Sequence, residues 1–506
     1  MDALAFEHHL TSPQGQGHRP AGSHAATAGG YACCDEITFS VAVDRDRVSG
    51  AGFEAHGCGA TTAAASAAVT LVRGAGVLDA ARIGPWEIAG ELGGLSPAKL
   101  HAAELAADAL ARALGAAVRA DGSLPATGGT GDTGDTGTGT ASGASTGTTG
   151  PTLVAMSGGV DSAVAAHLCA QRGPAMAVTL ELWSDSENDA ETSCCSATAV
   201  AQARSLAHSM GMAHFTIDLR DEFRAGVVDP FIAGYAAGET PNPCVGCNGH
   251  VRLDAMLALA DRLGCETLAT GHYARTAERD DQRGPLLRAA VDAAKDQTYM
   301  LAALSPRSLA RMRFPLGELR KPEVRQIAAD AGLPVAAKVD SQDLCFLAGT
   351  TRARFLERHG GITARTGEIV NTTGGVLGGH EGQHRFTVGQ RRGIGIQSAE
   401  PLYVLRKDGD SGRVTVGTSA ELRADRVQIR AARLHRAGAR VDSVKLRYRQ
   451  RPLRARLVGH AEAGRHRSLA IELQDPADGA APGQLACLMD GELVVGWGTI
   501  DQPAAS

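Results

Sequence analysis

One tract limits how this chain can fold. Residues 121–150 read DGSLPATGGTGDTGDTGTGTASGASTGTTG. Gly, Thr, Ser and Asp dominate this tract, and because such a composition buries almost no apolar surface, it predicts a flexible linker. The 506 residues therefore form a small front part and a large back part. At roughly 150 residues per domain, the length predicts about three or four domains.

Bulk composition is typical of a soluble globular protein, with 43% hydrophobic and 21% charged residues. No apolar run reaches the roughly 18 residues that a membrane span needs, and the N-terminus has no secretory pattern. We therefore expect a cytoplasmic location and no membrane partner. The net charge of −5 means that any nucleic-acid surface must be local. Residues 445–456 (KLRYRQRPLRAR) are the best candidate, and a solvated strand face is the alternative.

The residue patterns of the front part predict a disordered tail over residues 1–29 and an α+β domain over residues 30–120. Residues 36–55 alternate as two strands of a hairpin do. Helical patterns follow over residues 61–74 and 97–118.

Behind the linker, short apolar strands alternate with loops and helices. This order predicts an α/β domain with a parallel, doubly wound, Rossmann-like sheet over residues 151–348. Gly-rich turns and short alternating strands then predict a small central β-rich domain over 349–423 and a C-terminal β-barrel over 424–506.

The loop Ser157-Gly158-Gly159-Val160-Asp161-Ser162 follows a strand and opens a helix. Its glycines let the backbone approach an anion, and the helix N-terminus offers free N–H groups. Asp161 is placed to hold Mg²⁺ against phosphates. The loop lacks the Gly-Lys-Ser/Thr ending of a Walker A motif. It resembles the PP-loop of ATP pyrophosphatases, whereas an ordinary strand–helix turn is the alternative.

The chain has eleven cysteines, which in a cytosolic protein are more often ligands or catalysts than disulfide partners. Cys244 and Cys247 form a C-x-x-C, and Cys345 stands alone in SQDLCF. Cys194 and Cys195 form a further pair to which we assign no role. The cysteines with apolar neighbours are expected to be buried filler: Cys169, Cys265 and Cys487.

Six motifs of the back part occur in a fixed order: TPNPCVGCN, ATGHYAR, KDQTYML, FPLGELRKPEVR, DSQDLCF and GQRRGIGI. Together they resemble the MnmA/TrmU family of tRNA 2-thiouridylases, and the resemblance covers residues 151–506 almost continuously. It implies ATP-dependent replacement of the C2 oxygen of the wobble uridine (U34) by sulfur, with release of AMP and pyrophosphate. It also implies an ATP site made of Ala155, Met156, Ser157, Gly158, Gly159, Val160, Asp161, Ser162, Leu180 and Gly271.

The resemblance implies that Cys247 carries a persulfide and that Cys345 is the second catalytic cysteine. A persulfide is a strong nucleophile, and a second thiol releases its outer sulfur by closing a disulfide. Many relatives have Asp where this chain has Cys244. Cys244, Cys247 and Cys345 are therefore also a plausible ligand set for a [4Fe–4S] cluster with one open iron. Persulfide chemistry, cluster chemistry and a Zn site all remain open at this stage.

The expected partners are the anticodon stem-loop of tRNA and a cysteine desulfurase or sulfur-relay protein. The target base must leave its stack because C2 is otherwise inaccessible. The resemblance places the tRNA-contacting residues at His272, Lys295, Asp296, Gln297, Arg447, Tyr448 and Gln484. A packed core histidine is the alternative for His272.

Residues 31–115 resemble NifU/IscU-type iron–sulfur scaffolds. Cys33, Asp35, Cys58 and His101 match metal-ligand positions, so we expect an iron–sulfur cluster or Zn in this domain. Ala102 stands where the third scaffold cysteine belongs, and a domain used only for docking is the alternative.

Two other functions fit parts of the sequence. One is a scaffold or cluster-storage protein with a vestigial PP-loop, and the other is a different ATP pyrophosphatase such as argininosuccinate synthase. The intact loop argues against the first, and the cysteines and the all-β tail argue against the second.

Overall fold

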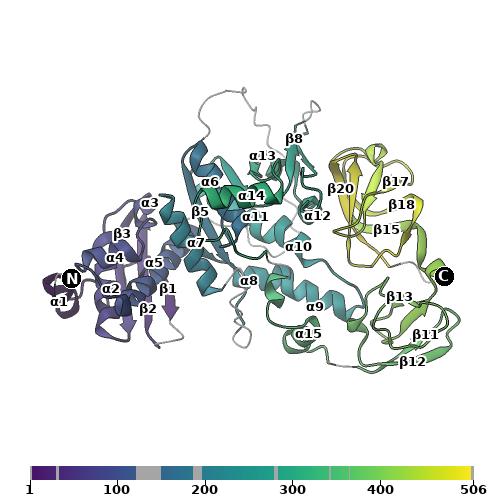
Figure 1. Ribbon diagram of the computed structural model, residues 1–506, viewed down its shortest axis with the longest axis horizontal. Helices are drawn as coiled ribbons and strands as arrows, with labels where there is room; N and C mark the ends of the chain where they lie inside the picture. The colour runs from purple at the N-terminus through teal and green to yellow at the C-terminus, as the bar shows by residue number, and fades with distance from the viewer. Residues whose placement is uncertain are drawn as a thin grey trace. The chain divides into compact units, whose positions relative to one another are not determined.

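The computed structural model describes residues 3–29, 34–120, 150–185, 196–278, 283–340, 344–363 and 365–502 (Figure 1). The chain divides into two compact units. The first contains Met1–Arg220, Ala255–Gly271 and Pro322–Ser341, and the second contains Asp221–Asp254, His272–Lys321 and Gln342–Ser506. No helix in the described part of the chain has the length and apolarity that crossing a bilayer requires.

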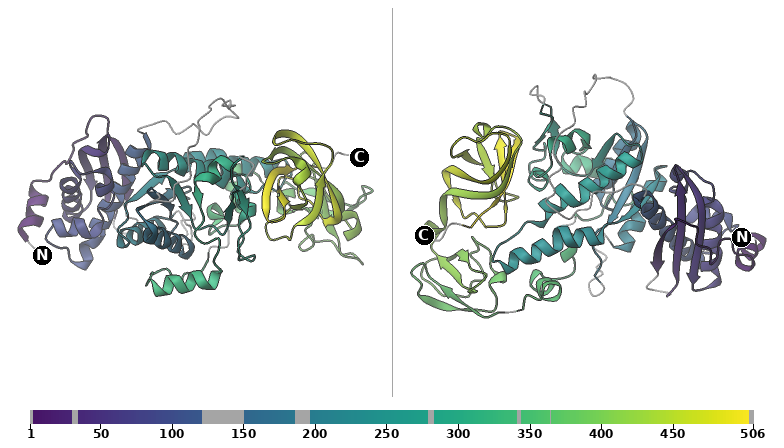
Figure 2. Two further views of the ribbon diagram at one scale, coloured as in Figure 1. Left: turned by 90° about the horizontal axis from the view of Figure 1, so that it is seen from above. Right: turned by 180° about the vertical axis from the view of Figure 1, so that it is seen from behind.

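The first unit begins with a front domain built on an antiparallel sheet. Its strands are β1 (His24–Gly29), β2 (Glu36–Asp44) and β3 (Arg47–His56), in that order across the sheet. They are the purple arrows in the right-hand view of Figure 2. The helices of this domain are α1 (Ala3–Thr11), α2 (Gly59–Val72), α3 (Val77–Ala80), α4 (Pro85–Glu91), η1 (Pro97–Lys99) and α5 (Leu100–Ala120). Helix α5 packs against β1 and β2, and α2 packs against β3. The predicted α+β class is confirmed.

The expectation of a disordered tail over residues 1–29 is wrong, because α1 and β1 are both ordered parts of the front domain. His9 helps to fix α1, since its Nδ1 lies 2.8 Å from Ser66 Oγ and both side chains are buried. A contact between residues so far apart in sequence leaves no periodic pattern, so the sequence of residues 1–29 did not indicate that this segment is ordered.

The PP-loop domain follows in the same unit. The strands β4 (Thr152–Ala155), β5 (Ala175–Glu181), β6 (His214–Asp218) and β7 (Thr267–Thr270) are parallel and lie in the order β7-β4-β5-β6. Its helices are α6 (Val160–Arg172), α7 (Ala197–Ser209), α11 (Leu253–Arg262) and α14 (Lys321–Asp330). The predicted parallel sheet is confirmed, and its carboxyl ends meet at one edge.

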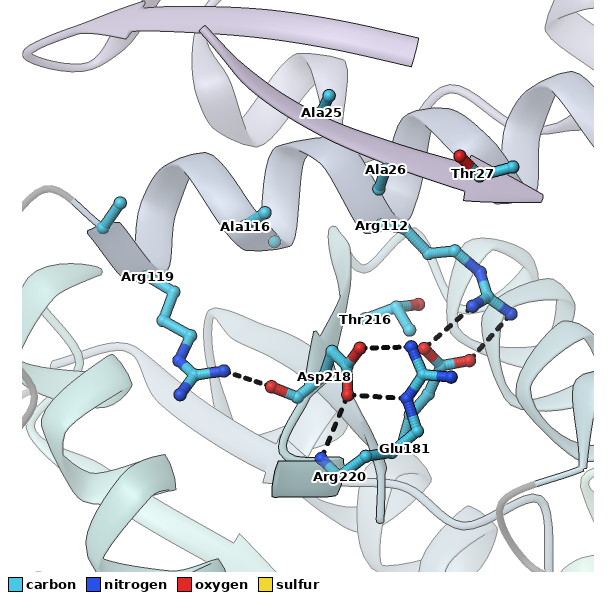
Figure 3. Close-up of a pocket in the computed structure, with 12 residues that line it drawn as sticks. Ala25, Ala26, Thr27, Arg112, Ala116, Arg119, Glu181, Thr216, Asp218 and Arg220 are labelled. Atoms are coloured by element: carbon cyan, nitrogen blue, oxygen red, sulfur yellow. Dashed lines mark hydrogen bonds and ion pairs between the residues drawn. The ribbon is translucent and has the colours of Figure 1, made fainter. Parts of the chain in front are cut away.

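The front domain is docked on the PP-loop domain through α5. Gly115 faces the carbonyl of Thr216 on β6 so closely that a Cβ there would lie 1.9 Å from the oxygen. Arg112 pairs with Glu181 at 2.7 Å, and Arg204 of α7 pairs with Asp108 at 2.7 Å. Figure 3 shows the Arg112–Glu181 pair next to Arg220, whose guanidinium meets the carboxylate of Asp218. Buried ion pairs need good geometry to offset their desolvation, and here each guanidinium meets a carboxylate.

The second unit begins with helices that carry an aromatic cluster. These elements are η2 (Arg224–Val228), α9 (Asp229–Ala236), α10 (Pro243–Gly246), η3 (Cys247–Arg252), α12 (Thr298–Leu301), α13 (Pro306–Arg311), η4 (Cys345–Leu347) and α15 (Arg352–Gly360). The ring of Phe346 lies 5.2 Å from that of Phe231 and 5.1 Å from that of Phe355, centroid to centroid. Offset and edge contacts of this kind add about 0.5–1.5 kcal/mol per pair beyond area burial.

The central domain is a four-stranded sheet with its own small core. Its strands β11 (Gly367–Val370), β12 (Val376–His380), β13 (Tyr403–Lys407) and β14 (Val414–Gly417) lie in the order β12-β11-β14-β13. Ile369, Val404, Val414 and Val416 are fully buried in it.

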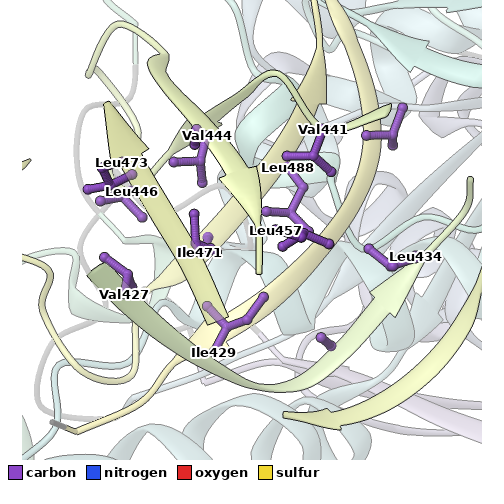
Figure 4. Packing of buried hydrophobic residues seen from close by; sticks show 14 of the residues in the cluster. Val427, Ile429, Leu434, Val441, Val444, Leu446, Leu457, Ile471, Leu473 and Leu488 are labelled. Atoms are coloured by element: carbon purple, nitrogen blue, oxygen red, sulfur yellow. The ribbon is translucent and has the colours of Figure 1, made fainter. Parts of the chain in front are cut away.

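The C-terminal domain is a closed barrel. Its strands are β15 (Arg423–Leu434), β16 (Ser443–Lys445), β17 (Leu453–Leu457), β18 (Gly464–Asp478), β19 (Leu485–Asp490) and β20 (Leu493–Ile500). β15 pairs with both β18 and β20, which closes the barrel and leaves no open edge there. Ile429, Val444, Ile471 and Leu488 fill its interior (Figure 4). The hairpin β8 (Arg275–Ala277) and β9 (Leu286–Arg288) extends this sheet through β20, which the sequence did not predict.

Candidate functional site

The SGGVDS loop has the geometry of an anion cradle. Gly159 is the N-cap of α6, so the first N–H groups of that helix open onto the loop. The Ser157 N–H donates to Ser162 Oγ at 3.1 Å, and the Ser162 hydroxyl donates to the Gly159 carbonyl at 3.1 Å. Gly158 has a φ of +69°, and a Cβ there would lie 2.9 Å from the Ala199 carbonyl. The loop therefore requires glycine at this position and is held by its two serines.

Neighbouring elements brace the loop from both sides. A Cβ on Gly271 would lie 2.7 Å from the Ser162 nitrogen, so the ATGHYAR segment needs glycine where it meets α6. Lys338 Nζ donates to the Gly158 carbonyl at 3.0 Å and to Gln202 Oε1 at 3.2 Å. The sequence reasoning missed Lys338, whose only signal was its place just ahead of DSQDLCF. Its ammonium adds a positive charge beside the cradle.

Two other residues expected in the ATP site, Met156 and Leu180, lie near the carboxyl ends of the parallel strands β4 and β5. Met156 and Leu180 are buried, at 3% and 7% exposed. The Met156 N–H donates to the Val178 carbonyl at 2.8 Å. These positions therefore shape the carboxyl edge of the sheet, where nucleotides bind in doubly wound folds.

The C-x-x-C lies on a short helix with a defined start. Asn242 is the N-cap of α10, and its Oδ1 accepts from the Cys244 N–H at 3.1 Å. Pro243 occupies the first helical position, where a missing N–H costs nothing. Cys247 follows at the start of η3 and is buried. Burial raises the pKa of the Cys244 thiol, partly offset by the charge of Arg252.

Cys345 is positioned by its neighbours. It opens η4, and Phe346 anchors that turn in the aromatic cluster of α9 and α15. One cavity is lined by Asn242 and Pro243 from the first cysteine loop and by Leu344 and Leu347 from the second. The structure thus brings two segments about a hundred residues apart to the same cavity, and the pairing of Cys247 with Cys345 stays a prediction.

The three thiols of this region are not grouped as ligands of a single ion. Within the part of the chain that the structure describes, the sulfur atoms of Cys244, Cys247 and Cys345 do not all lie within 4.8 Å of one another. Three thiolates on one Zn²⁺ lie closer together than this, so these residues do not form a preassembled Zn site in the structure. No disulfide is seen among the described cysteines, which include these three.

The KDQ segment is tied into the fold. Asp296 Oδ2 accepts from Lys445 Nζ at 2.9 Å, and these side chains are only 7% and 11% exposed. Gln297 Oε1 accepts from the Tyr273 N–H at 2.9 Å. The Lys295 N–H donates to the Asp292 carbonyl at 3.0 Å. Asp296 therefore links this segment to Lys445 of the barrel, and Gln297 links it to the backbone at Tyr273.

The other residues expected to contact tRNA also make contacts within the protein or are buried. Arg447 Nη2 donates to the carbonyls of Asp478 and Gly479 at 3.1 and 3.2 Å. Gln484 Nε2 donates to the Thr240 carbonyl at 2.6 Å, beside the cysteine loop. The ring of Tyr448 lies 6.4 Å from that of Tyr299. Burial, with the nearby charge of Arg252, lowers the pKa of His272 to about 3, so this ring is neutral at physiological pH.

The front domain gathers Asp35, Cys58 and His101, whose ligand atoms all lie within 4.8 Å of one another. His101 Nδ1 lies 3.0 Å from the Ala98 carbonyl. If Nδ1 carries the proton, the Nε2 lone pair points at the site, as metal-binding histidines require. Thr61, which the sequence reasoning missed, donates to Asp35 Oδ2 at 2.6 Å and is the main cause that lowers the pKa of Asp35.

Some residues named in the sequence predictions lie outside the described part of the chain or are buried in the core. Cys33, Cys194 and Cys195 lie outside the described residues. Ala102 is fully buried on α5, so a buried methyl group stands where the third scaffold cysteine belongs. Cys169, Cys265 and Cys487 are buried, as expected of filler.

Comparisons with known proteins cover both parts of the chain. A family model described as NifU-like N terminal domain matches residues 5–119, and one described as tRNA methyl transferase HUP domain matches residues 151–349. Models described as tRNA methyl transferase PRC-barrel domain and aminomethyltransferase beta-barrel domain match residues 353–418 and 419–500. A bifunctional protein NifU/MnmA from Rubrobacter xylanophilus is 42% identical over 505 residues, which is 97% of each chain. The chain belongs to the bifunctional NifU/MnmA family.

Membership of the NifU/MnmA family confirms the predicted resemblance of both parts. The tRNA-specific 2-thiouridylase MnmA of Acidithiobacillus ferrooxidans is 42% identical over 354 residues, which cover 69% of this chain and 97% of that protein. A solved structure of the U34-tRNA thiolase NcsA from Methanococcus maripaludis with its [4Fe-4S] cluster is 18% identical, covers 42% of this chain and 65% of that chain, and has a TM-score of 0.25. That score is too low to carry an argument about sulfur chemistry in a NifU/MnmA protein.

Proposed function

We propose that this chain is an ATP-dependent tRNA 2-thiouridylase that converts the wobble uridine to 2-thiouridine. The observation that carries the proposal is a cavity lined by neighbours of two cysteines, Asn242 and Pro243 before Cys244 and Leu344 before Cys345, because the chemistry needs two thiols near one base. The SGGVDS cradle in the other unit supplies the ATP-binding chemistry. Membership of the NifU/MnmA family supports the same assignment.

The reaction begins by turning a poor leaving group into a good one. The uridine O2 attacks the α-phosphorus of ATP, forming an O2–adenylate and releasing pyrophosphate. The N–H groups at the start of α6 and the Lys338 ammonium stabilise the phosphate charge. Asp161 would hold the Mg²⁺ that such phosphates bring, and a bound Mg²⁺ neutralises part of their charge.

Sulfur then replaces the activated oxygen. On the persulfide route, the outer sulfur of a Cys247 persulfide attacks C2, and the C2–O bond breaks to release AMP. The Cys345 thiolate attacks Cys247 Sγ, so a Cys247–Cys345 disulfide forms while the S–S bond to the transferred sulfur breaks. The two-electron reduction of that disulfide by an external thiol restores the enzyme. The persulfide itself would come from a cysteine desulfurase or sulfur-relay protein.

A cluster route uses the same three cysteines differently. Cys244, Cys247 and Cys345 would hold a [4Fe–4S] cluster, which when bound supplies an open iron to carry the transferred sulfide. In the front domain, Asp35, Cys58 and His101 would hold a metal ion or cluster. Three ligands leave a coordination position open, which suits a site that passes on its cargo.

Substitutions at the cysteines test this proposal. Cys247→Ser and Cys345→Ser should each abolish thiolation, because both routes use both residues. Thiolation is measured by mass spectrometry of nucleosides, and AMP release is measured with and without tRNA. AMP release that does not depend on tRNA, or full thiolation by Cys247→Ser, would refute the assignment.

Cys244 separates the two sulfur routes. On the cluster route, anaerobically purified Cys244→Ala should lose iron and activity together, since two protein ligands seldom retain a four-iron cluster. On the persulfide route, Cys244→Asp should remain active without iron. We favour the cluster route, since a C-x-x-C with a distant cysteine suits such a site. An iron-free, fully active Cys244→Asp would reverse that preference and leave the thiolase assignment intact.

A further inference from the structure

The cavity beside the cysteine loops has a cationic wall that the chemistry above does not use. Arg352, the first residue of α15, lines the cavity together with Tyr235 of α9. The Arg352 guanidinium carbon lies 5.2 Å from the centroid of the Tyr235 ring, and Nη1 donates to Tyr235 Oη at 3.2 Å. The ring contact and the hydrogen bond together hold the guanidinium of Arg352 against Tyr235.

A second cation lies against the same ring. Lys407 Nζ is 5.5 Å from the centroid of Tyr235, and the side chain is only 2% exposed. It donates to the Glu239 carbonyl at 3.1 Å and to Thr240 Oγ1 at 3.4 Å. Both of these acceptors are neutral oxygens, so they satisfy the hydrogen bonds of the ammonium without cancelling its charge.

Among the described residues, no carboxylate lies within ion-pair distance of either cation. The nearest candidate, Glu239, directs its carboxylate to Arg430 at 2.8 Å. Arg385, whose carbonyl accepts from Arg352 Nη2 at 3.4 Å, directs its own guanidinium to Glu381 at 2.6 Å. Two partly desolvated positive charges without a counter-charge are costly, and a bound anion would offset that cost.

The cavity wall offers a neutral donor as well. The Thr350 hydroxyl lines the cavity and is buried without a hydrogen-bond partner in the structure. Buried hydroxyls are almost always paired, so an orphan facing a polar cavity indicates a ligand with acceptor atoms.

We propose that Arg352, backed by Lys407, binds a phosphodiester group of the tRNA next to the uridine that is thiolated. This inference rests on the proposed function. A base that enters the cavity between the two cysteine loops brings the phosphates of its own nucleotide with it. The phosphates of ATP have the SGGVDS cradle, so the RNA backbone is the source we assign. Guanidinium suits this ligand because its planar N–H groups match phosphate oxygens.

The inference has a consequence for pH. Burial and the neighbouring Arg352 lower the pKa of Lys407 to about 7, against the smaller opposing effect of Glu239. The other groups facing it are Tyr235, whose pKa is raised by burial, and His384, whose pKa is lowered by burial. A bound phosphate would raise the pKa of Lys407, so binding would take up a proton above pH 7. Affinity should therefore fall as pH rises above about 7 and level off below it.

Binding of an anticodon stem-loop to the full-length protein tests the site. Arg352→Gln should weaken binding about 10-fold and lower the slope of log K against log salt by about one. Arg352→Lys should recover part of the affinity because it keeps the charge. Arg354→Gln, an exposed arginine on the same helix that does not line the cavity, should bind like the parent protein.

Equilibrium binding of ATP, measured on the same variants, separates the possible sources of phosphate. Unchanged ATP affinity with weakened RNA affinity supports the inference. Weakened ATP affinity with unchanged RNA affinity would assign the subsite to the nucleotide and overturn it. Unchanged affinity for both ATP and RNA in a folded Arg352→Gln protein would contradict the inference. Arg352 would then serve only to position Tyr235. If the parent protein binds no tRNA at all, the proposed function fails as well.

Discussion

At the scale of single residues, the same side chains that the sequence assigns to RNA contact turn out to support the fold. Asp296 accepts from Lys445, Thr298 and the backbone of Ala290. Sequence indicates that a polar residue matters at a position, but it does not show which atoms that residue faces. The tRNA contact that the motif KDQ implied therefore stays a prediction, and the structure shows that Asp296 and Gln297 also support the fold.

Asp296→Asn tests which role dominates. The change leaves the nearly buried Lys445 ammonium without its carboxylate, and breaking a buried pair typically costs about 3–5 kcal/mol. We expect a lower thermal midpoint, with any loss of tRNA affinity following from it. Lys295→Ala is the control, because Lys295 is partly exposed and its loss should weaken RNA binding with little effect on stability. A stable Asp296→Asn protein with impaired RNA binding would restore the direct-contact interpretation.

At the scale of elements, α5 connects two features of the first unit. It begins beside His101 of the metal-ligand set and continues to Asp108, Arg112 and Gly115 at the PP-loop domain. Burial alone would raise the pKa of Asp108, but the charges of Arg204 and Arg112 outweigh it and lower that pKa. The docking is therefore favoured by an ionised Asp108 and should weaken in acid, as pH falls through the lowered pKa.

Asp108→Leu should loosen this docking, because it leaves Arg204 buried at 3% exposed without its carboxylate. We expect faster hydrogen exchange in α5 and β6, equivalent to a loss of roughly 3 kcal/mol. Asp79→Asn is the matched control, since the Asp79–Arg82 pair is largely exposed and such pairs are worth about 1 kcal/mol or less. The double variant Asp108→Leu with Arg204→Leu should regain much of the protection. Equal exchange in all four proteins would show that these charges do not hold the domains together.

At the scale of the whole chain, the sequence predicted the order and class of the domains. Periodicity shows which residues are buried, so the parallel sheet around Val154 and the closed barrel around Ile429 could be predicted. Contacts between distant segments have no local signature. The docking of α5, the fixing of α1 by His9, the β8–β9 hairpin and the cavity wall at Arg352 all depend on such contacts. The pairing of Cys247 with Cys345 comes from family motifs alone and stays a prediction.

Shortening the linker tests how the front domain works. Both ends of the linker meet one short segment of the PP-loop domain. Arg262 donates to the carbonyls of Val118 and Arg119, and Glu266 accepts from the Gly150 N–H at 2.9 Å. Removing residues 126–140 should therefore leave docking intact. If the front domain acts while docked, thiolation at limiting sulfur donor should be unchanged. A several-fold slower rate, with normal hydrogen-exchange protection of α5, would show that the domain has to leave its dock.

The proximity of the linker ends also determines how this protein responds to dilution. Two separate polypeptides joined by the α5 surface would part as their concentration fell. Here both parts belong to one polypeptide, so release of α5 leaves the front domain covalently joined to the rest of the chain and raises its effective concentration there. Reassociation is then a first-order event whose equilibrium is independent of how much protein the cell makes. The ratio of front domain to thiolase part stays fixed at one even when copy number is low.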